Sequence, residues 1–278
     1  MIKDILVHIP TERPMRPVID ASVSLAEKFG AHLDALAVGY VSVNTAFVMD
    51  GTAAVATVFE IEQERAAARA EAALAVFEAE ARNAGISYHC RSIADIPGDA
   101  AAAVVAAARL YDLTVVLQPE AEHETFDNTI VREILFQAGG PVLFVPHILR
   151  GAFDARRIGI CWDGSRLAAR ALRDAKPFLA DADALVAISV NGAESVPAEA
   201  SAEKLARHLA RDGLPVRLID LPAARSDIQP SILSLAADES LDMLVMGAYG
   251  HSRLQEGILG GVTREMLRTT TVPTLMSH

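Results

Sequence analysis

The stretch "MGAYGHSRLQEGILGGVTREML", residues 246–267, decides the fold, because it joins an apolar run to an amphipathic segment through a glycine-rich connection. Gly247 and Gly250 stand three residues apart, and Gly260 and Gly261 stand together before the expected helix. In a parallel α/β sheet, such a loop lies at the carboxyl end of a strand, where these folds bind ligands. Glycines lack the Cβ atom that would hold a phosphate away from the backbone, and a helix N-terminus attracts anions. The stretch therefore predicts an anion-binding loop; glycines that serve only tight turns and close packing are the alternative.

The same alternation of short apolar runs and longer Ala-rich segments extends along the rest of the chain. Expected strands in the first half include "DILVHI", "HLDALAV", "LTVVLQ" and "PVLFV", with helices over residues 16–29, 59–83 and 99–111. The second half runs through "RIGICW", "ALVAISV", "PVRLID", "DMLVMG" and "PTLMS", with helices over residues 167–178, 197–211 and 231–239 and after Gly261. Strands that alternate with helices in this way predict βαβ units and a parallel sheet.

The two halves of the chain repeat one another. The segment "VREILFQAGGPVL" from Val131 aligns without gaps on "TREMLRTTTVPTL" from Thr263, and Asp112 aligns on Asp242 just upstream. We therefore predict an α/β fold of two repeated open parallel-sheet domains, each with five strands and with helices on both faces, packed as a pseudo-dimer. The domains are expected at residues 1–149 and 155–278, because the last strand of the first copy has ended there and the next has not begun.

Composition and charge exclude several classes of protein. A chain of 278 residues is long enough for about two domains of ~100 to 200 residues each. With 51% hydrophobic and 22% charged residues it is expected to be globular, and its net charge of −11 argues against a general nucleic-acid or membrane-surface binder. No long apolar run and no leader pattern stands out, so we expect a cytoplasmic protein. Cys90 and Cys161 are expected to be buried free thiols, and the histidines show no metal-ligand spacing.

The glycine spacing is neither a Walker loop nor a dinucleotide fingerprint. It resembles the ATP-binding signature of the universal stress protein family, G-x2-G-x9-G-[ST], which is met here by Gly247, Gly250 and Gly260. The resemblance covers both halves, so the chain resembles a tandem universal stress protein with an adenine-nucleotide alpha hydrolase-like, Rossmann-like fold. It implies that the closing strands "PVLFV" and "PTLMS" meet at the seam between the copies. It also implies a homodimer, which is the habit of the family.

The resemblance also implies a role for each site residue. Asp163, at the end of the strand "RIGICW", is expected beside the adenine, with the first two glycines near the ribose and phosphates. The sequence departs from the signature at Gly261, where the family prefers Ser or Thr, so the phosphates are expected near the backbone amides of the residues that open the helix. The full set of expected nucleotide-binding residues is Asp163, Gly247, Gly250, Arg253, Gly260, Gly261, Val262 and Thr263. Asp163 as a turn or cap residue and Arg253 as a solvated loop residue are the alternatives.

The first copy lacks the features that this loop needs. Leu117, Glu120, Asn128 and Thr129 replace the four glycines, and Glu120, Glu122, Glu124 and Asp127 concentrate negative charge in the loop. These carboxylates repel another anion even through water. We therefore expect no ATP in the first copy, and a solvated acidic loop predicts the same absence.

Three functions remain open from the sequence. The first is an ATP-binding protein with a regulatory or stress-response role, which holds ATP, with or without Mg²⁺, in the second half only and has an unidentified protein partner. The second is an interaction scaffold without nucleotide. The third is a slow ATP hydrolase, although the chain shows neither a phosphate-loop lysine nor an evident water-positioning residue, and we assign no catalytic residue and no metal site. The stress, the pathway and the partner are not identified by the sequence.

Overall fold

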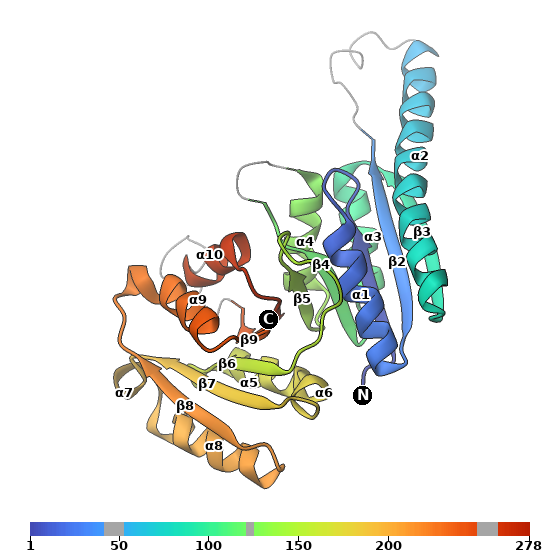
Figure 1. Cartoon of the computed structure of the whole chain (residues 1–278). Coiled ribbons are helices and arrows are strands. Elements are labelled where there is room, and N and C mark those ends of the chain that lie inside the picture. The colour runs from blue at the N-terminus through green and yellow to red at the C-terminus, as the bar shows by residue number, and fades with distance from the viewer. Residues whose placement is uncertain (42–52, 121–124, 249–260) are drawn as a thin grey trace. The chain divides into compact units, whose positions relative to one another are not determined.

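The computed structural model describes residues 1–41, 53–120, 125–248 and 261–278. The chain divides into two compact units (Figure 1). We call residues 2–138 and 150–153 the N-terminal unit, and residues 139–149 and 154–278 the C-terminal unit. No helix among the described residues is long and apolar enough to cross a membrane.

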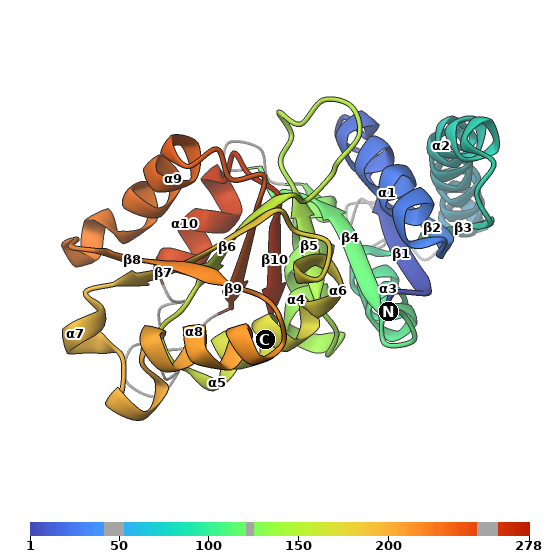
Figure 2. The ribbon, with the colours of Figure 1, turned by 60° about the horizontal axis from the view of Figure 1, so that its bottom comes forward.

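The N-terminal unit is a parallel sheet with helices on both faces. Its strands are β1 (Asp4–Ile9), β2 (His32–Tyr40), β3 (Tyr88–Asp95) and β4 (Leu113–Leu117), in the order β3-β2-β1-β4. Its helices are α1 (Arg16–Phe29), α2 (Ala53–Ala84), α3 (Pro97–Ala108) and α4 (Phe126–Gln137). Helices α1 and α2 pack together on one face, and α3 and α4 pack together on the other (Figure 2).

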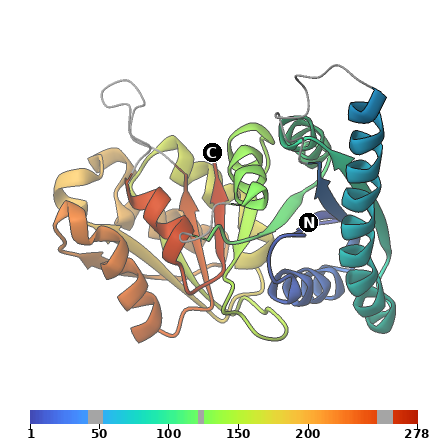
Figure 3. The same cartoon turned by 90° about the horizontal axis from the view of Figure 1, so that it is seen from above.

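Helix α2 runs along β2 and β3 (Figure 3) and buries one narrow stripe of its side chains. Ala66, Ala70, Phe77 and Ala81 lie fully buried at helical spacing, while most of the helix surface is exposed. Gly39 on β2 makes the close approach possible, because a Cβ atom there would overlap the carbonyl oxygen of Ala66. Helix α2 is therefore a largely solvated helix with a thin buried stripe.

Strand β3 was not among the expected strands. Its sequence "YHCRSIAD" has few apolar residues, and its side chains are half-buried or exposed. The strand lies at the end of the unit's strand order, and among the strands that the structure describes it pairs with β2 alone. A strand in that position needs less apolar surface than a central one, so hydrophobic patterning does not reveal it.

The C-terminal unit is a second α/β sheet. Its strands are β5 (Val142–Val145), β6 (Arg157–Cys161), β7 (Ala184–Val190), β8 (Val216–Leu221), β9 (Met243–Gly247) and β10 (Thr274–Ser277), in the order β5-β10-β9-β6-β7-β8. Its helices are α5 (Arg166–Asp174), α6 (Lys176–Leu179), α7 (Gly192–Ser195), α8 (Ala202–Arg211), α9 (Ile228–Asp238) and α10 (Gly261–Thr269), with the 3-10 turn η2 (Ala198–Ala200) before α8 and η3 (Arg225–Asp227) before α9. Figure 2 shows α5 and α8 on one face and α9 and α10 on the other.

The closing strands of the two repeats pair with each other, as expected. Strand β5 runs antiparallel to β10, with Leu143 opposite Leu275 and Phe144 opposite Thr274. Among the described residues the strands therefore divide four to six between the units and not five to five, because β5 completes the sheet of the C-terminal unit. The α/β class with a repeated, mostly parallel sheet is confirmed. That residues 1–149 and 155–278 each form a domain stays a prediction.

One aspartate in each copy makes the same pair of hydrogen bonds, which confirms the repeat in atomic detail. Asp112, just before β4, accepts hydrogen bonds from the backbone N–H groups of Lys3 (2.7 Å) and Asp4 (3.1 Å) at the start of β1. Asp242, just before β9, accepts the equivalent pair from Arg156 (3.0 Å) and Arg157 (2.8 Å) at the start of β6. The two copies thus join their first and fourth strands by the same contact, and the alignment of Asp112 on Asp242 holds in the structure.

Candidate functional site

The expected nucleotide-binding residues divide into two groups. Gly250, Arg253 and Gly260 lie outside the described residues. Gly247 ends β9, and Asp163 follows the end of β6, which is the parallel neighbour of β9. The structure therefore brings these two residues to the same edge of the sheet, at the carboxyl ends of the strands. Gly261, Val262 and Thr263 open helix α10, and Thr263 is buried.

Gly247 has a packing reason of its own. A Cβ atom at this position would lie 2.6 Å from the backbone nitrogen of Ala168 and 2.6 Å from the carbonyl carbon of Leu167, in the first turn of α5. Real side chains do not come so close to a neighbouring backbone, so only glycine allows β9 to end against this helix. Close packing therefore requires glycine at position 247 without any ligand. A contact between Gly247 and a nucleotide stays a prediction.

Asp163 stabilises the turn that leads into α5. Its Oδ1 atom accepts a hydrogen bond from the backbone N–H of Ser165 (2.9 Å). Gly164 between them has a φ of 71°, which favours glycine, and Ser165 caps α5 by accepting the N–H of Ala168 (3.1 Å). A carboxylate has more acceptor sites than this turn uses, so the expected contact of Asp163 with adenine is compatible with its place but stays a prediction.

The segment after β7 covers this turn. A helix was expected over residues 197–211, but the chain forms the 3-10 turn η2 first, and α8 begins only at Ala202. A Cβ atom on Gly164 would lie 3.0 to 3.1 Å from Val196, Pro197 and Ala200. The indole N–H of Trp162 donates a hydrogen bond to the carbonyl oxygen of Ala200 (2.7 Å), and the ring is 9% exposed. Trp162 is therefore a core residue that anchors η2.

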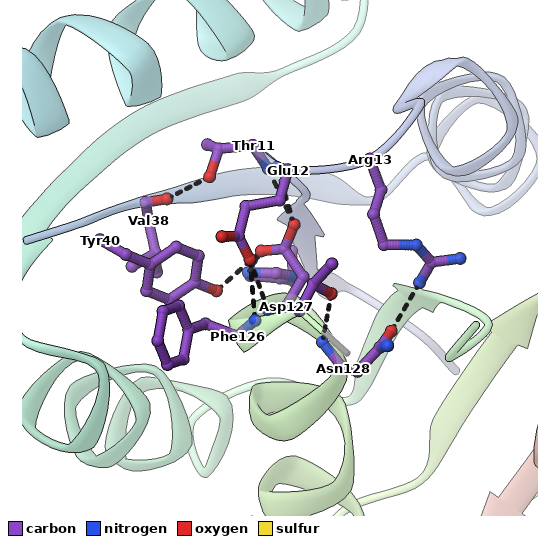
Figure 4. Close-up of polar contacts among 10 residues, drawn as sticks. Thr11, Glu12, Arg13, Val38, Tyr40, Phe126, Asp127 and Asn128 are labelled. Carbon is purple, nitrogen blue, oxygen red and sulfur yellow. Dashed lines mark hydrogen bonds and ion pairs between the residues drawn. The ribbon is translucent and has the colours of Figure 1, made fainter. Parts of the chain in front are cut away.

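In the first repeat, two carboxylates of the chain itself, Glu12 and Asp127, lie between the loop after β1 and the N-terminus of α4 (Figure 4). This is the place that corresponds to the expected phosphate site of the second repeat. Glu12, in the loop after β1, accepts hydrogen bonds through Oε2 from the backbone N–H groups of Phe126 (2.8 Å) and Asp127 (3.4 Å). These are the first two residues of α4. A carboxylate at a helix N-terminus satisfies N–H groups that have no partner within the helix and interacts favourably with the helix dipole. Glu12 thus takes the position that an anionic ligand would take at this helix.

Asp127 makes the reciprocal contacts. Its Oδ2 atom accepts the backbone N–H groups of Thr11 (3.1 Å) and Glu12 (3.0 Å), and its Oδ1 atom accepts the hydroxyl of Tyr40 (2.7 Å). Asp127 is 1% exposed. The alternative of a solvated acidic loop therefore does not hold for Asp127, because three hydrogen-bond donors compensate the burial of its charge. We call Glu12 and Asp127 the exchanged carboxylates.

Asn128, which aligns with Gly260 of the second copy, links Arg13 to the backbone of Glu120 beside the exchanged carboxylates. Its Oδ1 atom accepts hydrogen bonds from Arg13 (3.0 Å) and from the backbone N–H of Glu120 (3.1 Å), and its amide group donates to the carbonyl oxygen of Glu120 (3.2 Å). Figure 4 shows Arg13 and Asn128 pointing toward each other beside the exchanged carboxylates. Two of the residues that replace the glycines, Glu120 and Asn128, thus form a polar network with Arg13.

Burial shifts the pKa values of the groups around Asp127. Burial raises the pKa of Glu12, and the charge of Asp127 raises it further. His8, whose Nε2 atom lies 3.7 Å from Asp127 Oδ1, has a pKa lowered by burial, which outweighs the opposite effect of Asp127. Burial and the charge of Asp127 also raise the pKa of Tyr40, which therefore remains a hydrogen-bond donor. No pattern within the sequence indicated this cluster, because its members come from segments far apart in the chain.

Comparison with known proteins relates the sequence and the fold to one family. Residues 155–278 match the sequence profile of the Universal stress protein family. A universal stress protein from Archaeoglobus fulgidus has the same fold, with a TM-score of 0.73 over 98% of this chain and 97% of that chain at 18% identity. Universal stress protein Slr1230 of Synechocystis sp. is 38% identical over 47 residues, which cover 17% of this chain and 16% of that protein. A universal stress protein solved in complex with cAMP matches 45% of this chain and 98% of that chain, at 21% identity and a TM-score of 0.35.

The resemblance drawn from the glycine spacing is confirmed by these matches. The profile covers the half that carries the glycine-rich loop, and the full-length structural match covers both repeats. Residues 155–278 belong to the universal stress protein family, and the whole chain has the fold of a full-length protein of that family.

Proposed function

We propose that this protein binds ATP in its second repeat only and has a regulatory role in a stress response. The exchanged carboxylates are the observation that carries the proposal. In the first copy, these two negatively charged groups accept hydrogen bonds from the backbone N–H groups after β1 and at the start of α4. A phosphate would have to displace them to reach the same N–H groups. At the aligned positions the second copy has Ser165 and Leu259, which carry no charge.

The second copy has the residue types that a phosphate loop needs. Its loop carries the three glycines of the family signature, followed by Gly261, and leads into α10, whose N-terminus favours an anion. In the proposed complex the phosphates, with or without Mg²⁺, lie near Gly250, Gly260 and the amides of Gly261, Val262 and Thr263, with Arg253 in reach and Asp163 and Gly247 on the nucleoside side. The proposal keeps the expected cytoplasmic location, a homodimer and an unidentified protein partner.

Release of bound nucleotide tests this function. The purified protein is denatured, and the released small molecules are separated by chromatography and identified by mass. We expect adenine nucleotide in the wild type and none in Gly250→Glu, which copies Glu120 of the first repeat into the second loop. Glu120→Gly is the matched control, and we expect it to leave the amount unchanged, because Asn128 and the exchanged carboxylates still fill the first site. Nucleotide in equal amounts from wild type and Gly250→Glu would contradict the proposal.

The scaffold remains the second candidate because apolar side chains are exposed on α2. Val58, Phe59 and Ile61 are 38 to 45% exposed near the start of this helix. A partner helix or strand would cover such side chains. The nucleotide measurement separates the two functions, since a scaffold releases none, and ADP formed from added ATP would reveal a slow hydrolase.

A further inference from the structure

Three side chains of the N-terminal unit are joined by polar contacts at the amino ends of β2 and β3, which lie side by side in Figure 1. The Oγ atom of Ser87 lies 2.7 Å from Nδ1 of His32, and Nε2 of His32 lies 3.4 Å from Oδ1 of Asp34. None of the three belongs to the expected nucleotide site. A hydroxyl, an imidazole and a carboxylate in this order are the parts of an activated serine nucleophile.

The pairing of β2 with β3 produces this arrangement. His32 and Asp34 stand two residues apart on β2, so their side chains lie on the same face of the sheet. Leu33 lies opposite Tyr88 in the parallel register, which places Ser87, the residue before β3, beside His32. Because 55 residues separate His32 from Ser87, no local motif in the sequence marks the three residues.

Asp34 determines which nitrogen of His32 carries the proton. Its Oδ2 atom accepts the hydroxyl of Tyr111, whereas its Oδ1 atom is buried and has no hydrogen-bond partner among the described residues. A proton on Nε2 of His32 points toward this buried oxygen and compensates its burial. Nδ1 is then an acceptor, and the hydroxyl of Ser87 donates to it. Burial and the hydrogen bond to Asp34 raise the pKa of Tyr111 to about 12, so its hydroxyl remains a donor.

The second repeat shows that the fold does not require these side chains. The strand registers of the two repeats, counted from the equivalent Asp112 and Asp242, identify the matching positions. In place of His32, Asp34, Ser87 and Tyr111, the second repeat has Ala184, Val186, Pro215 and Leu241. These four side chains form no hydrogen bonds, yet β7 and β8 pair as β2 and β3 do. The polar contacts are therefore an addition of the first repeat, and the strand pairing does not depend on them.

Ser87 is open to a substrate and has a backbone N–H group beside it. The residue is exposed, and the side chain of His32 is 36% exposed. The carbonyl oxygen of Ser87 accepts the N–H of Leu33, so the following N–H, that of Tyr88, points away from β2. No other described strand lies on that side of β3. This N–H is available to an oxygen that becomes negatively charged during attack by Ser87, as in hydrolases where the N–H after the nucleophile has that role.

We propose that Ser87 and His32 form a catalytic site that cleaves carboxylic esters, with Asp34 and Tyr111 as positioning residues. His32 takes the proton of Ser87 while Oγ bonds to the ester carbonyl carbon, and this proton passes to the leaving alcohol as the C–O bond breaks. Water that gives a proton to His32 then attacks the acyl group, so the carboxylic acid leaves and the serine hydroxyl is restored. Asp34 stabilises the imidazolium formed in each step. This activity does not depend on nucleotide in the second repeat.

Labelling with a fluorophosphonate ester tests the inference. In an activated serine the Oγ–P bond forms and the P–F bond breaks, while the hydroxyl proton passes through His32 and leaves with fluoride. We expect peptide mass spectrometry to find the label on Ser87 of the wild type. Without the general base, His32→Ala should be labelled about 100-fold more slowly. Release of nitrophenol from p-nitrophenyl butyrate should be lost in Ser87→Ala.

Two variants separate activation from structure. In Asp34→Asn, an amide that keeps its oxygen on Tyr111 turns its NH₂ group toward Nε2, which moves the proton of His32 to Nδ1. Labelling should then fall about 100-fold or more. A merely structural aspartate would change the melting temperature and leave the labelling rate unchanged. Ser92→Ala is the matched control, because it removes another exposed serine of β3, and it should be labelled on Ser87 like the wild type.

Two results would overturn the inference. One is a wild type without label on Ser87, and this result refutes it even if a variant does not fold. The other is an equal rate of labelling in the wild type and folded His32→Ala. Either result leaves the proposed nucleotide function untouched, because the two sites share no residue.

Discussion

Asp127→Ala tests the network that fills the first repeat. The substitution removes a buried carboxylate that accepts hydrogen bonds from the backbone N–H groups of Thr11 and Glu12 and from the hydroxyl of Tyr40. Each donor left without an acceptor costs about 1 to 3 kcal/mol. Entry of water and relief of the repulsion between the two carboxylates reduce the sum. We therefore expect the free energy of unfolding to fall by about 3 to 5 kcal/mol.

Urea unfolding followed by circular dichroism measures this loss. Glu62→Ala is the control, because it removes a carboxylate that pairs with Arg65 on the exposed surface of α2, and such pairs contribute at most about 1 kcal/mol. If Asp127→Ala does not fold, Asp127→Asn keeps the volume and one acceptor and should lose less. A change in Asp127→Ala no larger than that in Glu62→Ala would refute the view that this carboxylate holds the loop after β1 to helix α4.

Three further predictions concern stability and pH. Gly39→Ala should destabilise the N-terminal unit by several kcal/mol, because the new methyl group overlaps backbone of Ala66, and thermal unfolding measures the loss. Gly247→Ala should lower the melting temperature of the ligand-free protein, since its Cβ atom meets backbone of α5; an unchanged melting temperature would leave Gly247 with a ligand role alone. Because burial lowers the pKa of His8 below 6.5, its contribution to stability is complete above pH 6.5 and is lost as the pH falls from there toward the lowered pKa. His8→Leu should therefore reduce the pH slope of the unfolding free energy below pH 6.5 by up to about 1.4 kcal/mol per pH unit, and an equal slope in both proteins would contradict this reasoning.

Features set by local sequence were predictable. The expected helix over residues 16–29 coincides with α1, which has proline at its start and Gly30 at its end with a left-handed φ of 58°. The repeat was visible in aligned residues, and Asp112 and Asp242 make equivalent contacts. Apolar runs identified the central strands, because these are buried on both faces.

Features that depend on contacts between distant segments were not predictable. The exchanged carboxylates are separated by 115 residues, and only the folded sheet brings them together. The glycine spacing identified Gly247 as special, but the contact with the first turn of α5 explains it without a ligand.

The number of ATP molecules bound per chain tests the central claim most directly. The claim is that the second repeat alone is a nucleotide site, since the first holds its own carboxylates at the equivalent N–H groups. Titration calorimetry on nucleotide-free protein measures this number. The account predicts one ATP per chain, lost in Gly250→Glu and unaffected by Glu120→Gly; two equivalent sites per chain, or one site that survives Gly250→Glu, would contradict it.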